Sequence, residues 1–245
     1  MRPPESKIKS HIRQFYEQRY RGESGGARGL GGKPLAVELG YPPELIDSIP
    51  GETWEDFFPC GYVLSALDPK GGDRVLNLGC GAGVDSLLVK ICARVEFQVV
   101  NLDTAFSALV KAKRAARSVS SGRGFEFICA DGGSIPFEPG SFEWVILNGV
   151  FNLFPQKEEL IEELHRVLKP GGIVAGADLC RKGILPGYFA EEPDAWAWCM
   201  SGAVTGEELT RAFQARGFTH LGMAAENMDE FFDRAVFTFR KNGFS

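Results

Sequence analysis

The sequence of 245 residues lacks the features that mark a membrane-spanning or secreted protein. No apolar run approaches the roughly 20 residues that cross a bilayer, which excludes a transmembrane protein and argues against a membrane partner. The first 20 residues contain no apolar core of a secretory signal, so we expect a cytoplasmic protein. Positive charge is also scarce. The 27 Lys and Arg residues against 32 Asp and Glu argue against nucleic acid as a partner, because phosphate binding needs a basic surface.

Cysteine and histidine are few and scattered, with six Cys and three His in the chain. No C-x-x-C pair and no Cys/His cluster has the spacing of a zinc site, so we expect no metal site. In a chain of this length, the cysteines are typical of reduced thiols rather than of a disulfide framework. Cys92 and Cys129 fall within an expected helix and an expected strand, and we interpret them as packing residues.

Short apolar runs alternate with helical stretches through most of the chain. Strands that are apolar on both faces and alternate with helices predict a parallel sheet covered by helices on each side. A later helix at 205–216 has Thr205 and Glu208 at the positions of a capping box. The expected strands are 74–79, 96–103, 125–131, 142–148, 172–178, 218–223 and 235–240, and the expected helices between them are 84–93, 104–117 and 157–168.

An N-terminal arm precedes this alternating region. Residues 6–20 place apolar side chains at helical spacing, and six of the eleven residues in 22–32 are Gly. This glycine-rich segment is either a plain linker or a hinge that lets the arm close over a site. We therefore divide the chain into a helical arm or cap at 1–68 and a binding domain at 69–245, with an acceptor-site insertion at 181–205.

The strongest local signal is the segment LNLGCGAGVDSLL (76–88). Its three glycines occupy a turn between an apolar strand and a helix, where a ligand can approach the backbone closely. Asp103 ends the next strand, 20 residues after Gly83, where an acid can accept hydrogen bonds from ribose hydroxyls. Asp131 and Asn148 end the third and fourth strands. These residues predict a nucleotide or nucleoside site at the carboxyl edge of the sheet.

These motifs, together with HRVLKPGG (165–172), resemble those of class I S-adenosylmethionine-dependent methyltransferases of the type 11, UbiE-like group. The resemblance covers about residues 70–180. It implies a Rossmann-like, mostly parallel seven-stranded sheet with a reversed final strand. It also implies S-adenosylmethionine as cofactor, with S-adenosylhomocysteine as product. The family usually has an acid where this chain has Asn77, which predicts weaker cofactor affinity. The implied cofactor contacts are Asn77, Gly79, Cys80, Gly81, Gly83, Asp103, Thr104, Asp131, Gly132 and Asn148.

A second resemblance, to arsenite methyltransferases, concerns the acceptor. Cys199 begins the pattern Cys-x-x-Gly-Ala-Val-Thr, and Cys60 precedes a glycine upstream of the glycine loop. The segment 152–155 (NLFP) loosely matches a third motif. In that family, thiols hold a soft metalloid whose lone pair attacks the methyl group without a base. The third thiol of the family falls on Gly149 here.

We therefore predict an S-adenosylmethionine-dependent methyltransferase that acts on a small molecule by in-line transfer, without a strong general base. His11, His165 and His220 are interpreted as structural. Two acceptors stay open. One is an apolar organic molecule, slightly favoured by Gly149 and walled by the aromatic residues 151, 154, 188, 189, 196 and 198. The other is arsenite. A further alternative is a non-catalytic, cofactor-binding accessory protein, and the oligomeric state is open. The candidate acceptor-side residues are Cys199, Cys60 and Asn148.

Overall fold

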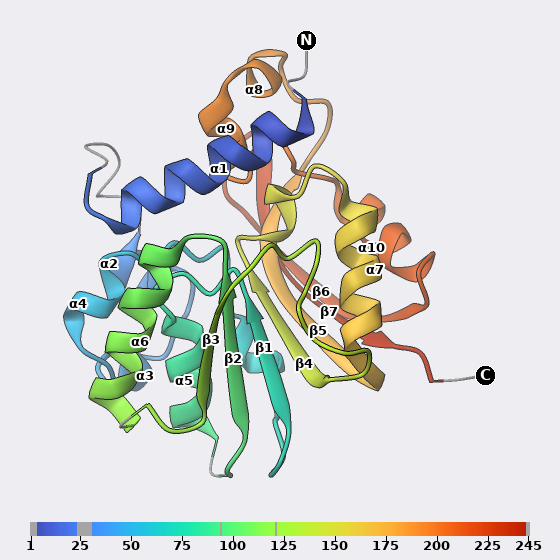
Figure 1. The fold of residues 1–245 in the computed structure, drawn as a ribbon. Coiled ribbons are helices and arrows are strands. Elements are labelled where there is room, and N and C mark those ends of the chain that lie inside the picture. The colour runs from blue at the N-terminus through green and yellow to red at the C-terminus, as the bar shows by residue number, and fades with distance from the viewer. Residues whose placement is uncertain (1–3, 24–30, 94, 121, 244–245) are drawn as a thin grey trace.

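Figure 1 shows the computed structural model, which describes residues 4–23, 31–93, 95–120 and 122–243. Seven strands form one sheet in the order β3-β2-β1-β4-β5-β7-β6. Neighbouring strands run parallel except β7, which is antiparallel to both β5 and β6. The predicted Rossmann-like sheet with a reversed final strand is therefore confirmed. The strands are β1 (Arg74–Leu78), β2 (Gln98–Asp103), β3 (Phe125–Cys129), β4 (Phe142–Asn148), β5 (Leu168–Arg181), β6 (Phe218–Asn227) and β7 (Phe232–Lys241).

Helices cover both faces of the sheet (Figure 1). One face carries α5 (Val84–Cys92) and α6 (Phe106–Ser120), and the other carries α7 (Lys157–Val167) and α10 (Gly206–Gln214). In the described part of the chain, no helix is long and apolar enough to cross a membrane. The shorter helices are α2 (Gly32–Glu38), α3 (Pro43–Ile46), α4 (Gly51–Trp54), η1 (Val63–Ala66), η2 (Phe151–Leu153), α8 (Tyr188–Glu191) and α9 (Pro193–Ala197).

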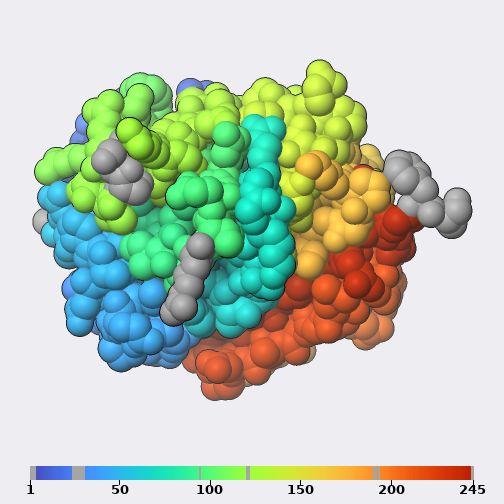
Figure 2. Space-filling view, turned by 90° about the horizontal axis from the view of Figure 1, so that it is seen from below, coloured from blue at the N-terminus to red at the C-terminus, as the bar shows by residue number. Residues whose placement is uncertain are grey.

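Two apolar clusters hold these layers together. Beneath α7 and α10, the rings of Phe213 and Phe239 stack with centroids 4.2 Å apart. On the opposite face, Trp54 shares one buried cluster with Val75 of β1 and Leu88 of α5. Figure 2 shows the same relation from below, where the blue N-terminal segment lies directly against the green and teal layers. The segment from α2 to η1 therefore packs on the sheet like the other helices that cover it.

The N-terminal region differs in part from its sequence-based description. Helix α2 was not expected, because its first residue, Gly32, was assigned to the end of the glycine-rich segment. Residues 24–30 of the proposed hinge lie outside the described residues, and the domain boundary after residue 68 stays a prediction.

Helix α1 (Glu5–Tyr20) lies across the carboxyl ends of the central strands (Figure 1). Near its middle, Tyr16 Oη donates a 2.8 Å hydrogen bond to the carbonyl oxygen of Ala197. Toward its C-terminus, the hydroxyl of Ser107 donates to the carbonyl oxygen of Glu17 over 3.2 Å. The helix thus connects α9 with α6, and it covers the edge of the sheet where a ligand crevice is expected.

The capping box of α10 is present as predicted. Thr205 Oγ1 accepts a hydrogen bond from the Glu208 amide over 3.1 Å, and Glu208 Oε2 accepts one from the Thr205 amide over 2.8 Å.

We expect Thr205→Ala to lower the free energy of unfolding by about 1 kcal/mol, because an amide of the first turn loses its partner. Urea denaturation measures this change. Thr210→Ala in the same helix leaves both cap bonds intact, and an equal loss in that variant would contradict the account.

Candidate functional site

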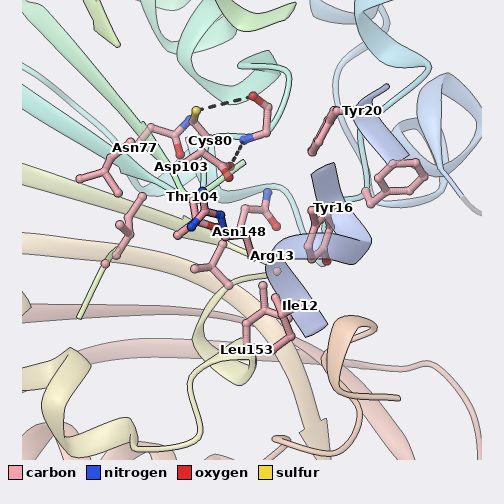
Figure 3. Close-up of a pocket in the computed structure, with 18 of the residues that line it drawn as sticks. Ile12, Arg13, Tyr16, Tyr20, Asn77, Cys80, Asp103, Thr104, Asn148 and Leu153 are labelled. Carbon is pink, nitrogen blue, oxygen red and sulfur yellow. Dashed lines mark hydrogen bonds between the residues drawn. The ribbon is translucent and has the colours of Figure 1, made fainter. Parts of the chain in front are cut away.

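A cavity of about 480 Å³ opens at the carboxyl edge of β1 to β4, beneath α1. This volume is in the range of small-molecule sites. Every predicted cofactor residue except Gly83 lines it. Figure 3 shows that side chains of α1 form the opposite wall, and none of these residues was singled out as a site residue from the sequence. The helix residues that line the cavity are Lys9, Ser10, Ile12, Arg13, Tyr16 and Tyr20.

The glycine loop lies between Asp103 and Tyr20. The amide of Gly81 donates a 2.9 Å hydrogen bond to Asp103 Oδ2, and Gly81 has a φ of +53°. A Cβ atom on Gly81 would lie 2.4 Å from Tyr20 Oη, so no other residue fits there without movement. Gly83 forms the N-cap of α5 and does not line the cavity.

Carboxylates follow the neighbouring strands, as expected. Asp103 also accepts a 2.9 Å hydrogen bond from the Ala105 amide, and burial raises the pKa of its carboxyl group although these backbone donors oppose the shift. Asp131 accepts from the Gly133 amide over 2.8 Å. Both carboxylates face the cavity from adjacent strand ends, so each is available to the hydroxyl or amino groups of a nucleoside.

A further carboxylate of the cavity, Asp85, was missed by the sequence analysis. It lies in the first turn of α5, is 4% exposed and lines the cavity. Its Oδ1 atom lies 2.9 Å from Tyr41 Oη, and its Oδ2 atom accepts from Asn148 Nδ2 over 3.0 Å. Burial raises its pKa to about 6, although both hydrogen bonds act to lower it. Its position two residues after the last glycine of the loop was the available signal.

Asn77 and Asn148 are both engaged by the protein. Asn77 Nδ2 donates to Ser86 Oγ over 2.8 Å, within a buried chain of hydrogen bonds that continues to Asn101. Asn148 Oδ1 accepts from the Cys60 amide over 2.8 Å, and its Nδ2 atom donates to Asp85. The side chain of Asn148 therefore positions Cys60 and Asp85, and its predicted contact with an acceptor stays a prediction.

The structure brings together Cys60 and Cys199, which are far apart in the sequence. Both side chains belong to one apolar cluster. The neighbouring Cys60 thiol, burial and nearby Asp178 raise the pKa of Cys199 well above its usual value. Cys199 Sγ lies 3.3 Å from the carbonyl oxygen of Gly149, and a Cβ atom on Gly149 would lie 3.4 Å from Cys60 Sγ. Gly149 lines the cavity, whereas neither thiol does.

Cys199 also has a φ of +62°, the only left-handed backbone conformation among the described non-glycine residues. Such a conformation costs a few kcal/mol at most and persists where the surrounding structure enforces it.

Other cysteines depart from expectation. Cys92 and Cys129 are exposed, so their interpretation as packing residues was wrong, because each lies at the end of its element.

The apolar side of the cavity combines expected and unexpected residues. Among the aromatic residues proposed for this wall, only Phe154 lines it, together with Leu153, Phe58 and Tyr16. Phe151 lies instead in the core, where no part of its side chain is exposed. The remaining aromatic residues of that set, at 188, 189, 196 and 198, lie outside the cavity wall.

The three histidines of the chain lie away from this site. No histidine lines the cavity: His11 pairs with Asp194 at 2.9 Å, His165 packs against Phe218, and His220 packs against Phe239. Within the described ranges, no group of three or more His, Cys, Asp and Glu side chains is placed to hold a metal ion.

The strand order, the glycine loop and the acids after β2 and β3 define a Rossmann-like methyltransferase fold with its ligand crevice at the carboxyl edge. The chain belongs to the methyltransferase domain family, whose sequence model matches residues 69–217.

Individual relatives extend this assignment. An arsenite methyltransferase from Halobacterium salinarum is 30% identical over 191 residues, which cover 77% of this chain and 48% of that protein. A demethylmenaquinone methyltransferase from Staphylococcus epidermidis is 26% identical over 113 residues, or 46% of each protein. This chain thus spans about half the length of these curated relatives.

A solved structure resembles the chain along most of its length. The arsenic(III) S-adenosylmethionine methyltransferase of Chlamydomonas reinhardtii superimposes with a TM-score of 0.68 and 25% identity. The match covers 82% of this chain and 74% of the algal chain.

Proposed function

We propose that the chain binds S-adenosylmethionine in the cavity beneath α1 and transfers its methyl group to a small-molecule acceptor, not to nucleic acid. The observation that carries this proposal is the glycine loop between Asp103 and Tyr20, which leaves no room for a Cβ atom at Gly81. The residues present fit the cofactor. The glycine loop, Asp103 and Asp131 can hold a nucleoside, and the buried carboxylate of Asp85 beside them suits a cation.

In this proposal, each strand end has a separate task. Asp103 accepts hydrogen bonds from ribose hydroxyls, while Asp131 and Gly132 face the adenine ring. S-adenosylmethionine supplies, when bound, a methyl group activated by its sulfonium. Helix α1 excludes water from the cavity, which favours transfer to the acceptor over side reactions.

The acceptor favoured by the cavity is an apolar organic molecule. The side chains of Ile12, Phe58 and Phe154 line the cavity together with Leu153 and Tyr16. The thiols lie behind Gly149, and the raised pKa of Cys199 keeps it protonated at neutral pH. Because the thiolate is the form that binds a soft metalloid, the resting state of this pair is unfavourable for arsenic.

A second candidate is trivalent arsenic, and a specific observation favours it. The side chains of Cys60 and Cys199 belong to one apolar cluster, and both positions were proposed as thiol ligands from the resemblance to arsenite methyltransferases. The Halobacterium and Chlamydomonas relatives named above support the same acceptor. In this alternative, two thiolates hold the metalloid below Gly149, after both have lost their protons.

Anaerobic calorimetry of the reduced protein with arsenite, at saturating S-adenosylhomocysteine, separates the two acceptors. For an organic acceptor, we expect no arsenite binding that depends on Cys60 or Cys199. Tight binding that is lost in both Cys199→Ser and Cys60→Ser would overturn this expectation and establish the arsenic candidate. Cys92→Ser is the matched control, because its exposed thiol lies outside the cavity.

Transfer of a labelled methyl group from S-adenosylmethionine to a panel of apolar acceptors tests catalysis itself. Product from any acceptor would exclude the alternative of a non-catalytic accessory protein. Cofactor binding without product from any organic or arsenical acceptor would favour that alternative instead.

A further inference from the structure

Asp85 is a buried carboxylate that faces the cavity with only neutral hydrogen-bond donors around it. These donors are Tyr41 Oη and Asn148 Nδ2. Among the described residues, no Lys, Arg or His forms an ion pair with Asp85. The cations that line the cavity are Lys9, which pairs with Glu5 at 3.3 Å, and Arg13, whose side chain is exposed.

The other carboxylates of the cavity are compensated or solvated. Asp103 accepts hydrogen bonds from two backbone amides, Asp56 pairs with Lys111, and Asp131 is exposed. Burying an ionised carboxylate without a cation is unfavourable, so Asp85 represents negative charge that a positively charged ligand would neutralise.

The order of groups along the sheet edge indicates which part of a ligand reaches Asp85. Asp131 follows β3 and Asp103 ends β2, so these two face the nucleoside in the proposed function. Asp85 lies further along, after β1, and its hydrogen bond to Asn148 places it beside the end of β4. A nucleoside held at β3 and β2 directs its 5′ substituent toward Asp85.

We propose that Asp85 is the receptor for the cationic amino-acid end of S-adenosylmethionine. This inference rests on the proposed function and adds a residue to it. Asn77, at the position where the family usually has an acid, is neutral and donates to Ser86. Asp85 supplies the negative charge of this part of the cavity from the first turn of α5 instead.

Calorimetry with three probes tests the proposal without measuring turnover. S-adenosylmethionine carries a sulfonium and an ammonium, S-adenosylhomocysteine keeps the ammonium, and 5′-methylthioadenosine keeps the nucleoside and sulfur but neither cation. We expect Asp85→Asn to weaken S-adenosylmethionine binding at least about 30-fold, and 5′-methylthioadenosine binding less than about threefold. We expect S-adenosylhomocysteine binding to weaken as much as S-adenosylmethionine binding, because this probe keeps the ammonium of the amino-acid end. Unchanged S-adenosylhomocysteine binding would overturn the proposal.

Tyr41→Phe is the matched control, because it removes a neutral partner of Asp85 and keeps the carboxylate. We expect this variant to retain the preference for S-adenosylmethionine over 5′-methylthioadenosine. Equal weakening of all three probes in Asp85→Asn, or no weakening of any, would overturn the role of Asp85. If the wild-type protein binds none of the probes, the proposed function itself fails.

Discussion

Gly81→Ala should abolish detectable cofactor binding while the protein stays folded. The new methyl group would lie 2.4 Å from Tyr20 Oη, and Tyr20, the last residue of α1, is buried. Alanine would also have to adopt the φ of +53°, which costs about 1–2 kcal/mol. Relief requires movement of the loop or of α1, and both are walls of the cavity. We expect affinity for S-adenosylhomocysteine to fall at least about 100-fold, or about 2.7 kcal/mol, by calorimetry.

Gly140→Ala is the control for backbone strain alone. Gly140 has a φ of +68°, and a Cβ atom there would meet nothing within 4 Å. It lies outside the cavity wall, in the turn before β4. The free energy of unfolding of this variant should fall by a similar strain energy, and its cofactor affinity should be unchanged. Loss of affinity in Gly140→Ala, or normal affinity in Gly81→Ala, would show that the collision with Tyr20 is not decisive.

Asp85 should make the ligand-free protein less stable as the pH rises from about 4 to about 7. Its pKa is about 6 in the folded state against 3.8 as the ordinary value. Between these values the native state binds more protons than the unfolded state, so the free energy of unfolding falls with increasing pH. The full effect is about 3 kcal/mol, of which about 1.4 kcal/mol falls between pH 5 and pH 8.

Urea denaturation of the wild-type protein and of Asp85→Asn at both pH values isolates this contribution. Other groups titrate equally in the two proteins, so their effects cancel in the difference. From pH 5 to pH 8, we expect the free energy of unfolding of the wild-type protein to fall by about 1.4 kcal/mol more than that of Asp85→Asn. An identical pH dependence in both proteins would mean that Asp85 is not a buried, uncompensated carboxylate.

Much of the fold follows from local patterns in the sequence. Each central strand is a short apolar run that ends at a glycine or a polar residue, so its type and boundary are both encoded locally. The capping box of α10 is a signal of the same kind, since Thr205 and Glu208 lie three residues apart. The reversed final strand, in contrast, was implied by the family resemblance and not by any local pattern.

An arm that covers a site was one of two interpretations of the N-terminal region, but the residues of α1 that form the wall could not be predicted because they depend on tertiary contacts. The sequence shows an amphipathic helix, but its periodicity does not say which surface the apolar face covers. Tyr20 was not singled out at all, although its hydroxyl lies against the glycine loop. Asp85 was overlooked for a related reason. An acid in the first turn of a helix is common, and only the packing of Tyr41 and Asn148 shows that it is buried.

The thiol pair shows what the resemblance could and could not provide. It selected Cys60 and Cys199, but their shared cluster and their position behind Gly149 follow from the packing of β4 against two distant loops. The sequence alone therefore left the acceptor open, and the burial of the pair now favours an organic molecule.

Calorimetric titration of the wild-type protein with S-adenosylmethionine tests the central claim most directly. The account predicts binding of one molecule per chain, saturating in the micromolar range and competed by S-adenosylhomocysteine. Absence of binding and of competition at millimolar concentration, in a protein that circular dichroism shows to be folded, would contradict it.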